Sequence, residues 1–251
     1  PIIASYPKSR IRTEQGVLQA AEWRIFMFYK STRNSNIKVS SAEAITQGIS
    51  VEGGLFVPES IPSISLDEIT SLADKSYADR AAFVFSKFLT DFTDVEIHYC
   101  TDNAYNTKNF ESESITEISH LFDGTYMLEL WHGPTCAFKD MALQILPYFL
   151  TTSAKKINLD KKIVILVATS GDTGKAALEG FKDVEGTQIM VFYPEQGVSP
   201  MQKRQMNTQE GGNVGVCAIK GNFDDCQNGV KMIFTNDEIK QKLDDNSLMF
   251  S

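Results

Sequence analysis

The most constraining feature of the chain is an unbroken apolar run over residues 163–168 that leads directly into a polar turn containing glycine. A run of this length between turn residues is typical of a strand buried on both faces of a parallel sheet. Apolar segments recur at 188–193 and 214–219, and segments of helical character occur at 175–182, 199–209 and 224–234. Because strands and helices alternate with short connections, the sequence predicts a three-layer α/β lobe with a parallel sheet and helices on both faces.

The N-terminal part has a different pattern. Three segments begin with serine and carry an acidic residue three positions later, at 40–43, 65–68 and 76–79. This spacing is typical of helix starts. Between the first two segments, residues 52–58 predict a turn and a short extended piece. The pattern indicates a small, mostly helical N-terminal region.

We therefore expect two domains, a helical one over residues 27–100 and the first part of the α/β lobe over residues 101–251. Within the second, residues 125–130 predict a strand and residues 140–150 a helix with Pro147 in its middle. Residues 1–26 are interpreted as an extension outside the fold, because Met27 opens a stretch like an ordinary protein start.

Composition narrows the classes of function. The formal net charge of −8 argues against a general nucleic-acid binder. The 4 cysteines are scattered with no C-x-x-C spacing, which disfavours a structural metal site or a disulfide framework and suits reduced thiols. No run approaches about 20 apolar residues, and the first residues lack a secretory pattern. These features predict a cytoplasmic protein with no metal, membrane or nucleic-acid partner.

A lysine stands where a helix is expected to begin. Lys139 follows a Gly-Pro turn and three apolar residues, 136–138. Near a helix N-terminus and in an apolar wall, the ammonium form of a lysine is disfavoured, and a neutral amine is what Schiff-base chemistry requires. Lys139 is therefore a candidate nucleophile, and the alternative is an ordinary solvated lysine. Nearby His132 is interpreted as a structural histidine that bonds to local backbone.

The turn after the central apolar run is a candidate anion site formed by Thr169, Ser170, Gly171, Asp172 and Thr173. In open α/β sheets, ligands bind beyond the carboxyl ends of strands, and a helix N-terminus attracts anions. The alternative is a plain N-cap, in which Asp172 or Thr173 caps a helix that begins near residue 175. The glycine spacing matches neither a Walker A loop nor G-x-G-x-x-G, so nucleotide binding is disfavoured.

Both motifs, with two N-terminal segments, resemble the threonine synthase family of fold type II (tryptophan-synthase-β-like) pyridoxal-phosphate enzymes. The resemblance covers residues 28–251, and it is carried by residues 29–34, 52–58, 132–140 and 168–174. It implies a cofactor, pyridoxal 5'-phosphate, and conversion of O-phospho-L-homoserine and water to L-threonine and phosphate. Lys139 and Phe138 would bind the cofactor, Lys139 would also move protons, and residues 169–173 would bind the substrate's anionic groups, most directly the α-carboxylate.

Members of this family continue well past the point that matches Ser251, with further anion-binding segments. The resemblance therefore implies a fragment or a partner half on a separate chain, and an isolated chain that is inactive, holds its cofactor weakly and self-associates. Two other hypotheses stay open: another fold type II amino-acid lyase or dehydratase, and a non-catalytic binding protein that retains the scaffold.

Overall fold

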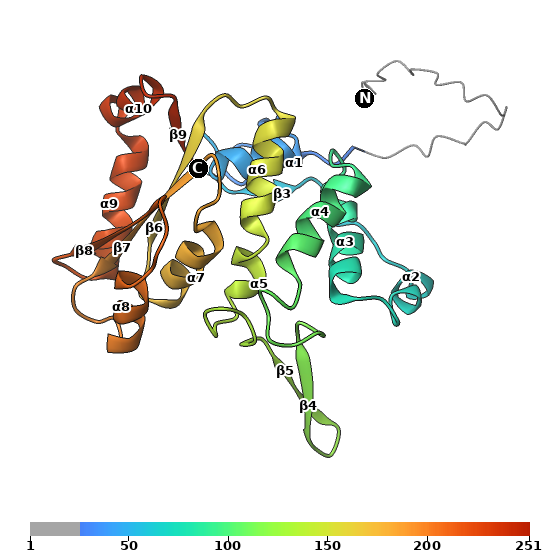
Figure 1. Ribbon diagram of the computed structural model, residues 1–251. Helices are drawn as coiled ribbons and strands as arrows, with labels where there is room; N and C mark the ends of the chain where they lie inside the picture. Colours follow the sequence, from blue (N-terminus) through green and yellow to red (C-terminus); the bar gives the residue numbers. More distant parts are fainter. Residues whose placement is uncertain (1–25) are drawn as a thin grey trace.

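The computed structural model describes residues 26–251 (Figure 1), so the interpretation of residues 1–26 lies almost entirely outside the described residues. In chain order the elements are β1 (Tyr29–Ser31), β2 (Lys38–Val39), α1 (Ser41–Gln47), β3 (Phe56–Pro58), α2 (Leu66–Ser71), α3 (Tyr77–Phe88), α4 (Asp94–Ala104), β4 (Glu117–Phe122), β5 (Thr125–Glu129), α5 (Asp140–Leu143), α6 (Leu146–Lys156), β6 (Lys162–Ala168), α7 (Asp172–Phe181), β7 (Thr187–Pro194), α8 (Pro200–Asn207), β8 (Val214–Ile219), α9 (Phe223–Thr235), α10 (Asp237–Asp244) and β9 (Leu248–Phe250). None of the helices within 26–251 is long and apolar enough to cross a membrane.

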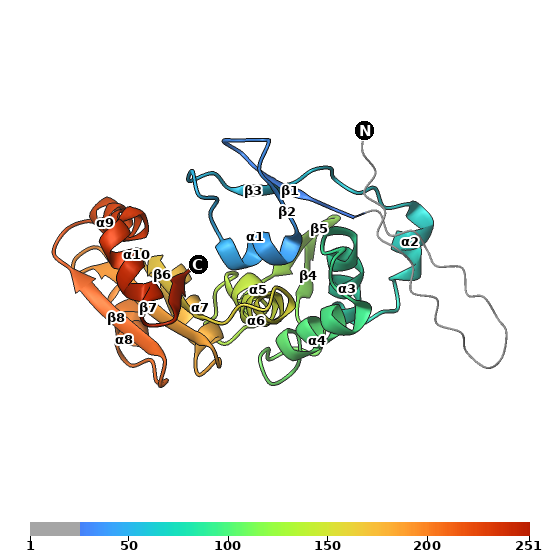
Figure 2. The same ribbon diagram turned by 90° about the horizontal axis from the view of Figure 1, so that it is seen from above.

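The C-terminal half contains the expected parallel sheet. Its strand order is β8-β7-β6-β9, and all three neighbouring pairs are parallel. Because β–α–β crossovers are right-handed, α7 and α8 cover one face and the α9–α10 pair covers the other (Figure 2). The α/β class with a parallel sheet and helices on both faces is confirmed. The sequence missed β9, whose three residues pair with the start of β6.

The two faces of this sheet are closed to different degrees. On the α7 and α8 side, Ile189, Val191 and Tyr193 are buried against Leu178 and Met206. On the other side only Cys226 of α9 is buried, and none of the described residues of α10 is. The prediction that β6 is buried on both faces is wrong for this chain: apart from Ile163 its residues are half-buried or exposed, including Ile165 and Val167, which pack into the core on the α7 and α8 side.

The N-terminal part is mostly helical, as expected, with a small antiparallel sheet of order β2-β1-β3. Capping boxes begin α1 at Ser40 and α2 at Ser65, and Ser76 caps α3. The sequence analysis missed a third capping box, in which Thr93 and Glu96 begin α4. Local capping thus fixes where these helices start.

Helix α6 joins the two parts. The segment 140–150 was expected to be one helix, but the helix breaks after Leu143 and restarts as α6, with Pro147 in its first turn, where a missing N–H costs nothing. Phe149 packs into an N-terminal core with Phe92 and Ile97, whereas the next residue, Leu150, packs into the core of the α/β part. Figure 2 shows α6 between α7 of the α/β part and helices α3 and α4 of the N-terminal part. The domain boundary at residue 100 stays a prediction.

Candidate active site

The candidate lysine lies where the sequence placed it. Lys139 immediately precedes α5, and its ammonium nitrogen is 3.8 Å from the centroid of the Phe138 ring. The apolar wall expected around it is absent, because 131–139 is a surface loop: Cys136 is exposed and the Phe138 side chain is 56% exposed. Within residues 26–251 the Lys139 amine makes no hydrogen bond or ion pair. Lys139 is half-buried, and its amine has no polar partner within this range.

The loop before Lys139 is fastened by the residue after it. The Asp140 carboxylate is fully buried and accepts hydrogen bonds from the Thr135 N–H (2.9 Å), the Thr135 hydroxyl (2.7 Å) and the Ala137 N–H (3.5 Å). Gly133 lies so close that a Cβ built on it would be 2.5 Å from the Asp140 Cβ. Packing thus requires glycine at position 133. The sequence analysis did not single out Asp140.

The polar turn forms a helix N-terminus with free donors. Helix α7 begins at Asp172, with Gly171 as its N-cap at φ 148°, a conformation that favours glycine. The prediction that Asp172 or Thr173 caps a helix starting near residue 175 is therefore wrong. Within the described chain, the backbone N–H groups of Ser170, Asp172 and Thr173 have no hydrogen-bond partner. Unpaired donors at a helix start are suited to an anion.

Thr169 has an internal task. It is only 2% exposed, and its hydroxyl oxygen accepts from the Gly171 N–H (3.0 Å) and the Gly174 N–H (2.9 Å). A Cβ on Gly174 would be 2.4 Å from the Thr169 methyl group. Thr169 therefore shapes the turn from inside, whereas Ser170 and Asp172 are its exposed members. The Asp172 carboxylate accepts a hydrogen bond from Gln202 of α8, which fixes the other side of the turn.

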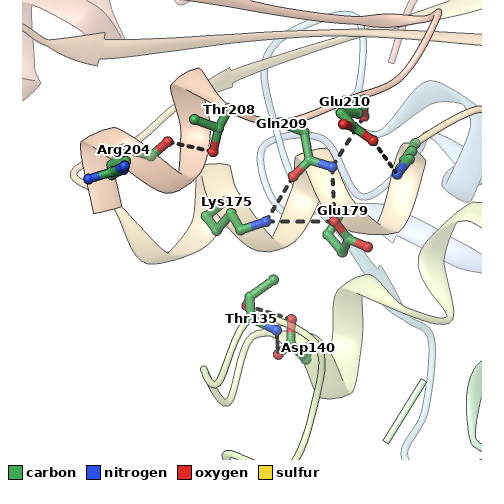
Figure 3. A network of polar contacts seen from close by, with 9 residues as sticks. Thr135, Asp140, Lys175, Glu179, Arg204, Thr208, Gln209 and Glu210 are labelled. Atoms are coloured by element: carbon green, nitrogen blue, oxygen red, sulfur yellow. Dashed lines mark hydrogen bonds and ion pairs between the residues drawn. The ribbon is translucent and has the colours of Figure 1, made fainter. Parts of the chain in front are cut away.

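Helices α5 and α7, which follow the two motifs in the chain, are in close contact. A Cβ on Gly180 of α7 would be 2.1 Å from the Leu143 carbonyl oxygen of α5, so only glycine lets the helices approach this closely. Figure 3 shows Lys175 and Glu179 of α7 beside Gln209: the Lys175 amine donates to Gln209 (2.8 Å), and Gln209 donates to Glu179 (2.9 Å). Helices α5 and α7 are thus in direct contact near their C-terminal ends.

Two neighbouring polar groups are structural. The His132 ring nitrogen Nε2 lies 2.8 Å from a Glu129 carboxylate oxygen, so the histidine bonds to a side chain and not to local backbone as expected. Hydrogen bonds from Ser119 and His132 lower the pKa of the Glu129 carboxyl. The loop at residues 221–225 connects β8 to α9, and Asn222 caps α9.

Comparisons with known proteins identify the family. Residues 28–105 match the family model described as threonine synthase N terminus. Threonine synthase of Pseudomonas aeruginosa is 37% identical over 211 residues, which cover 84% of this chain and 44% of that protein. The chain corresponds to the N-terminal part of threonine synthases. Its match to threonine synthase of Saccharomyces cerevisiae is 37% identical over 230 residues and covers 85% of this chain and 44% of the yeast protein.

Solved structures agree. The crystal structure of PLP-bound threonine synthase from Brucella melitensis superposes with a TM-score of 0.79 at 34% sequence identity. The superposition covers 90% of this chain and 47% of that one. The chain therefore spans less than half the length of these threonine synthases, and it matches their N-terminal part.

Proposed function

We propose that this chain is the N-terminal part of a pyridoxal-phosphate enzyme that converts O-phospho-L-homoserine and water to L-threonine and phosphate. The single observation that carries the proposal is the free Lys139 amine on an element that packs, through Gly180 and Leu143, against the helix whose N-terminal donors are unpaired. The family supplies the reaction, because the named relatives are threonine synthases.

The residues present fit this cofactor. Pyridoxal phosphate needs an amine for its aldehyde, room beside its ring and donors for anionic groups. The Lys139 amine has no competing hydrogen bond within the described chain, and the exposed Phe138 ring lies against it. The N–H groups of Ser170, Asp172 and Thr173 can bind a carboxylate or a phosphate. The site must also exclude water and bind the anionic groups firmly. These residues alone do so only in part.

In this proposal each residue has a defined role. Lys139 would hold the cofactor through its amine, and the same amine would move protons at the substrate Cα and Cβ. Ser170, Asp172 and Thr173 hold the α-carboxylate through their unpaired N–H groups, with Thr169 and Gly171 keeping the backbone of the turn in shape. Phe138 packs beside the reacting atoms. When bound, the cofactor supplies an electron sink for carbanions.

The chain covers about 44% of the P. aeruginosa and yeast relatives, so the activity of a whole threonine synthase is not ascribed to these residues alone. We expect the 251-residue chain by itself to retain the cofactor weakly and to turn over little or not at all. Each charge-assisted hydrogen bond to the cofactor that other segments would add contributes about 1.5–3 kcal/mol.

The test is the product formed from O-phospho-L-homoserine. The chain is assayed alone and with the C-terminal part of a related threonine synthase, for phosphate release and for threonine. Lys139→Ala should abolish both products, whereas Lys108→Ala, on an exposed lysine, should leave them unchanged. Release of phosphate with a keto acid in place of threonine would indicate another lyase. Phosphate and threonine formed equally by Lys139→Ala would refute the proposed function.

A further inference from the structure

A buried carboxylate belongs to the residue that directly follows the candidate catalytic lysine. Asp140 is 0% exposed, and within residues 26–251 no lysine, arginine or histidine forms an ion pair with it. A buried charge without a counter-ion is costly unless hydrogen bonds satisfy it. All of its donors come from the loop before Lys139, at Thr135 and Ala137. The buried carboxylate therefore depends on this loop for all of its hydrogen bonds.

The bonds fix the main chain on both sides of Lys139. On the N-terminal side, Asp140 holds Thr135 and Ala137, and Gly133 packs against its Cβ. On the C-terminal side, the Lys139 carbonyl oxygen accepts from the Ala142 N–H (3.1 Å) and the Leu143 N–H (2.9 Å). Only the side chain of Lys139 remains free to move.

We propose that Asp140 is a positioning residue, which sets the point from which the Lys139 amine reaches the cofactor. The inference rests on the proposed function, because it assumes that Lys139 reacts with a cofactor aldehyde. Since misplacement of a reacting group by about 1 Å costs on the order of 100-fold in rate, loosening the loop should slow the reaction of Lys139 by about 10- to 100-fold.

The hydrogen-bond pattern gives a sharp set of variants. Asp140→Ala removes every acceptor. Asp140→Asn should keep the loop, because the amide oxygen can accept from the Thr135 and Ala137 N–H groups while the amide NH₂ donates to the Thr135 hydroxyl. The Asn amide NH₂ needs the Thr135 hydroxyl as its acceptor. The double variant Asp140→Asn, Thr135→Val should therefore not keep the loop in place. Thr135→Val alone, which leaves the carboxylate its two N–H donors, is the background control.

The experiment measures how fast Lys139 is trapped by pyridoxal phosphate and borohydride, with the modified peptide located by mass spectrometry. Exposed Lys108 is the internal control in every variant. Urea unfolding gives the folded fraction, so that labelling is expressed per folded molecule. Peptide-resolved hydrogen exchange over residues 133–139 measures the protection of the loop's backbone amides in the absence of cofactor.

We expect Asp140→Ala and the Asp140→Asn, Thr135→Val double variant to slow Lys139 trapping about 10-fold or more, with Lys108 unchanged, and Asp140→Asn to stay within about threefold of the parent chain. Equal trapping per folded molecule in Asp140→Ala would overturn the inference, and so would an Asp140→Asn variant as slow as Asp140→Ala. If the parent chain is not trapped at Lys139 even when the C-terminal part of a related threonine synthase is added, the proposed function fails. Hydrogen exchange then decides: lost protection at Thr135 in Asp140→Ala supports control of the loop, and unchanged protection overturns it.

Discussion

Thr169 illustrates what a single residue in a sequence can and cannot reveal. A hydroxyl residue after a buried strand suits a ligand contact and an internal turn equally well, and the sequence analysis placed it among substrate-binding residues. In the structure its oxygen is occupied by two backbone N–H groups. Asp140 was missed for a related reason: an acidic residue in the first turn of a helix is usually explained by the helix dipole, and its backward reach to Thr135 leaves no local signal.

Thr169→Val should destabilise the turn. The substitution keeps the shape of the side chain but leaves the Gly171 and Gly174 N–H groups buried without an acceptor. We expect the free energy of unfolding in urea to fall by about 1–3 kcal/mol. Thr169→Ser keeps the acceptor and should cost less than Thr169→Val. The opposite order would contradict the role assigned to the hydroxyl.

Cys100 and Cys136 should differ in reactivity. Burial raises the pKa of the Cys100 thiol from 9.0 to about 11, whereas Cys136 is exposed. In iodoacetamide labelling at pH 8, Cys136 should react in the folded chain and Cys100 only after unfolding. Labelling of Cys100 at the rate of Cys136 would show that the N-terminal core is open.

The same raised pKa gives stability a pH dependence of known sign. Only the unfolded chain ionises Cys100 readily between pH 9 and pH 11, so its contribution to folding is present below pH 9 and is lost as pH rises through this window. Urea unfolding between pH 8 and pH 10.5 should show a shallower fall of stability in Cys100→Ala than in the parent chain. An equal slope would argue against a buried thiol.

At the scale of elements, long or capped segments were predictable and short ones were not. The bounds of β6 and β8 and the capped starts of α1–α3 agree with the sequence, because apolar runs and capping residues are local signals. Strands β2 and β9 have two and three residues, too few for a period to show. The split of α5 from α6 and the contact between α5 and α7 depend on partners distant in sequence.

Gly180→Ala tests the contact between α5 and α7. The added methyl group would meet the Leu143 carbonyl oxygen at 2.1 Å, so the helices must separate. Overpacking of this kind costs about 1–3 kcal/mol, and trapping of Lys139 by pyridoxal phosphate should slow as well. Gly229→Ala is the matched control, because its Cβ would meet no atom within 4 Å in α9. That variant should be neutral or stabilising by up to about 1 kcal/mol in urea unfolding, and Gly180→Ala should not.

At the scale of the whole molecule, large apolar surfaces remain uncovered. The hairpin of β4 and β5 projects from the body (Figure 1), and Ile118 and Leu128, paired across it, are 67% and 55% exposed. The outer face of the parallel sheet is also only partly covered, and Met190 is 36% exposed. Local periodicity predicts which residues share a face, but what covers that face depends on the assembled protein. The burial of β6 was mispredicted for this reason.

Replacing Ile118 and Leu128 together by threonine should reduce self-association. Threonine keeps the strand propensity of the hairpin and removes most of the exposed apolar surface that would draw copies together. Sedimentation velocity over a range of concentrations should show a shift toward the monomer. Ser119→Thr, on the opposite face of the hairpin, is the control and should leave the distribution unchanged. An identical distribution in the double variant would place any self-association elsewhere.

The central claim is that the Lys139 amine carries pyridoxal phosphate, and an absorption spectrum tests it most directly. The chain is mixed with the cofactor and reduced with borohydride, beside Lys139→Ala and Lys108→Ala. We predict a band at about 410–420 nm that reduction removes, leaving the cofactor fixed to the parent chain and to Lys108→Ala but not to Lys139→Ala. If no variant shows the band, the measurement is repeated with the C-terminal part of a related threonine synthase added. No band even then, or a band of equal strength in Lys139→Ala, would contradict the account.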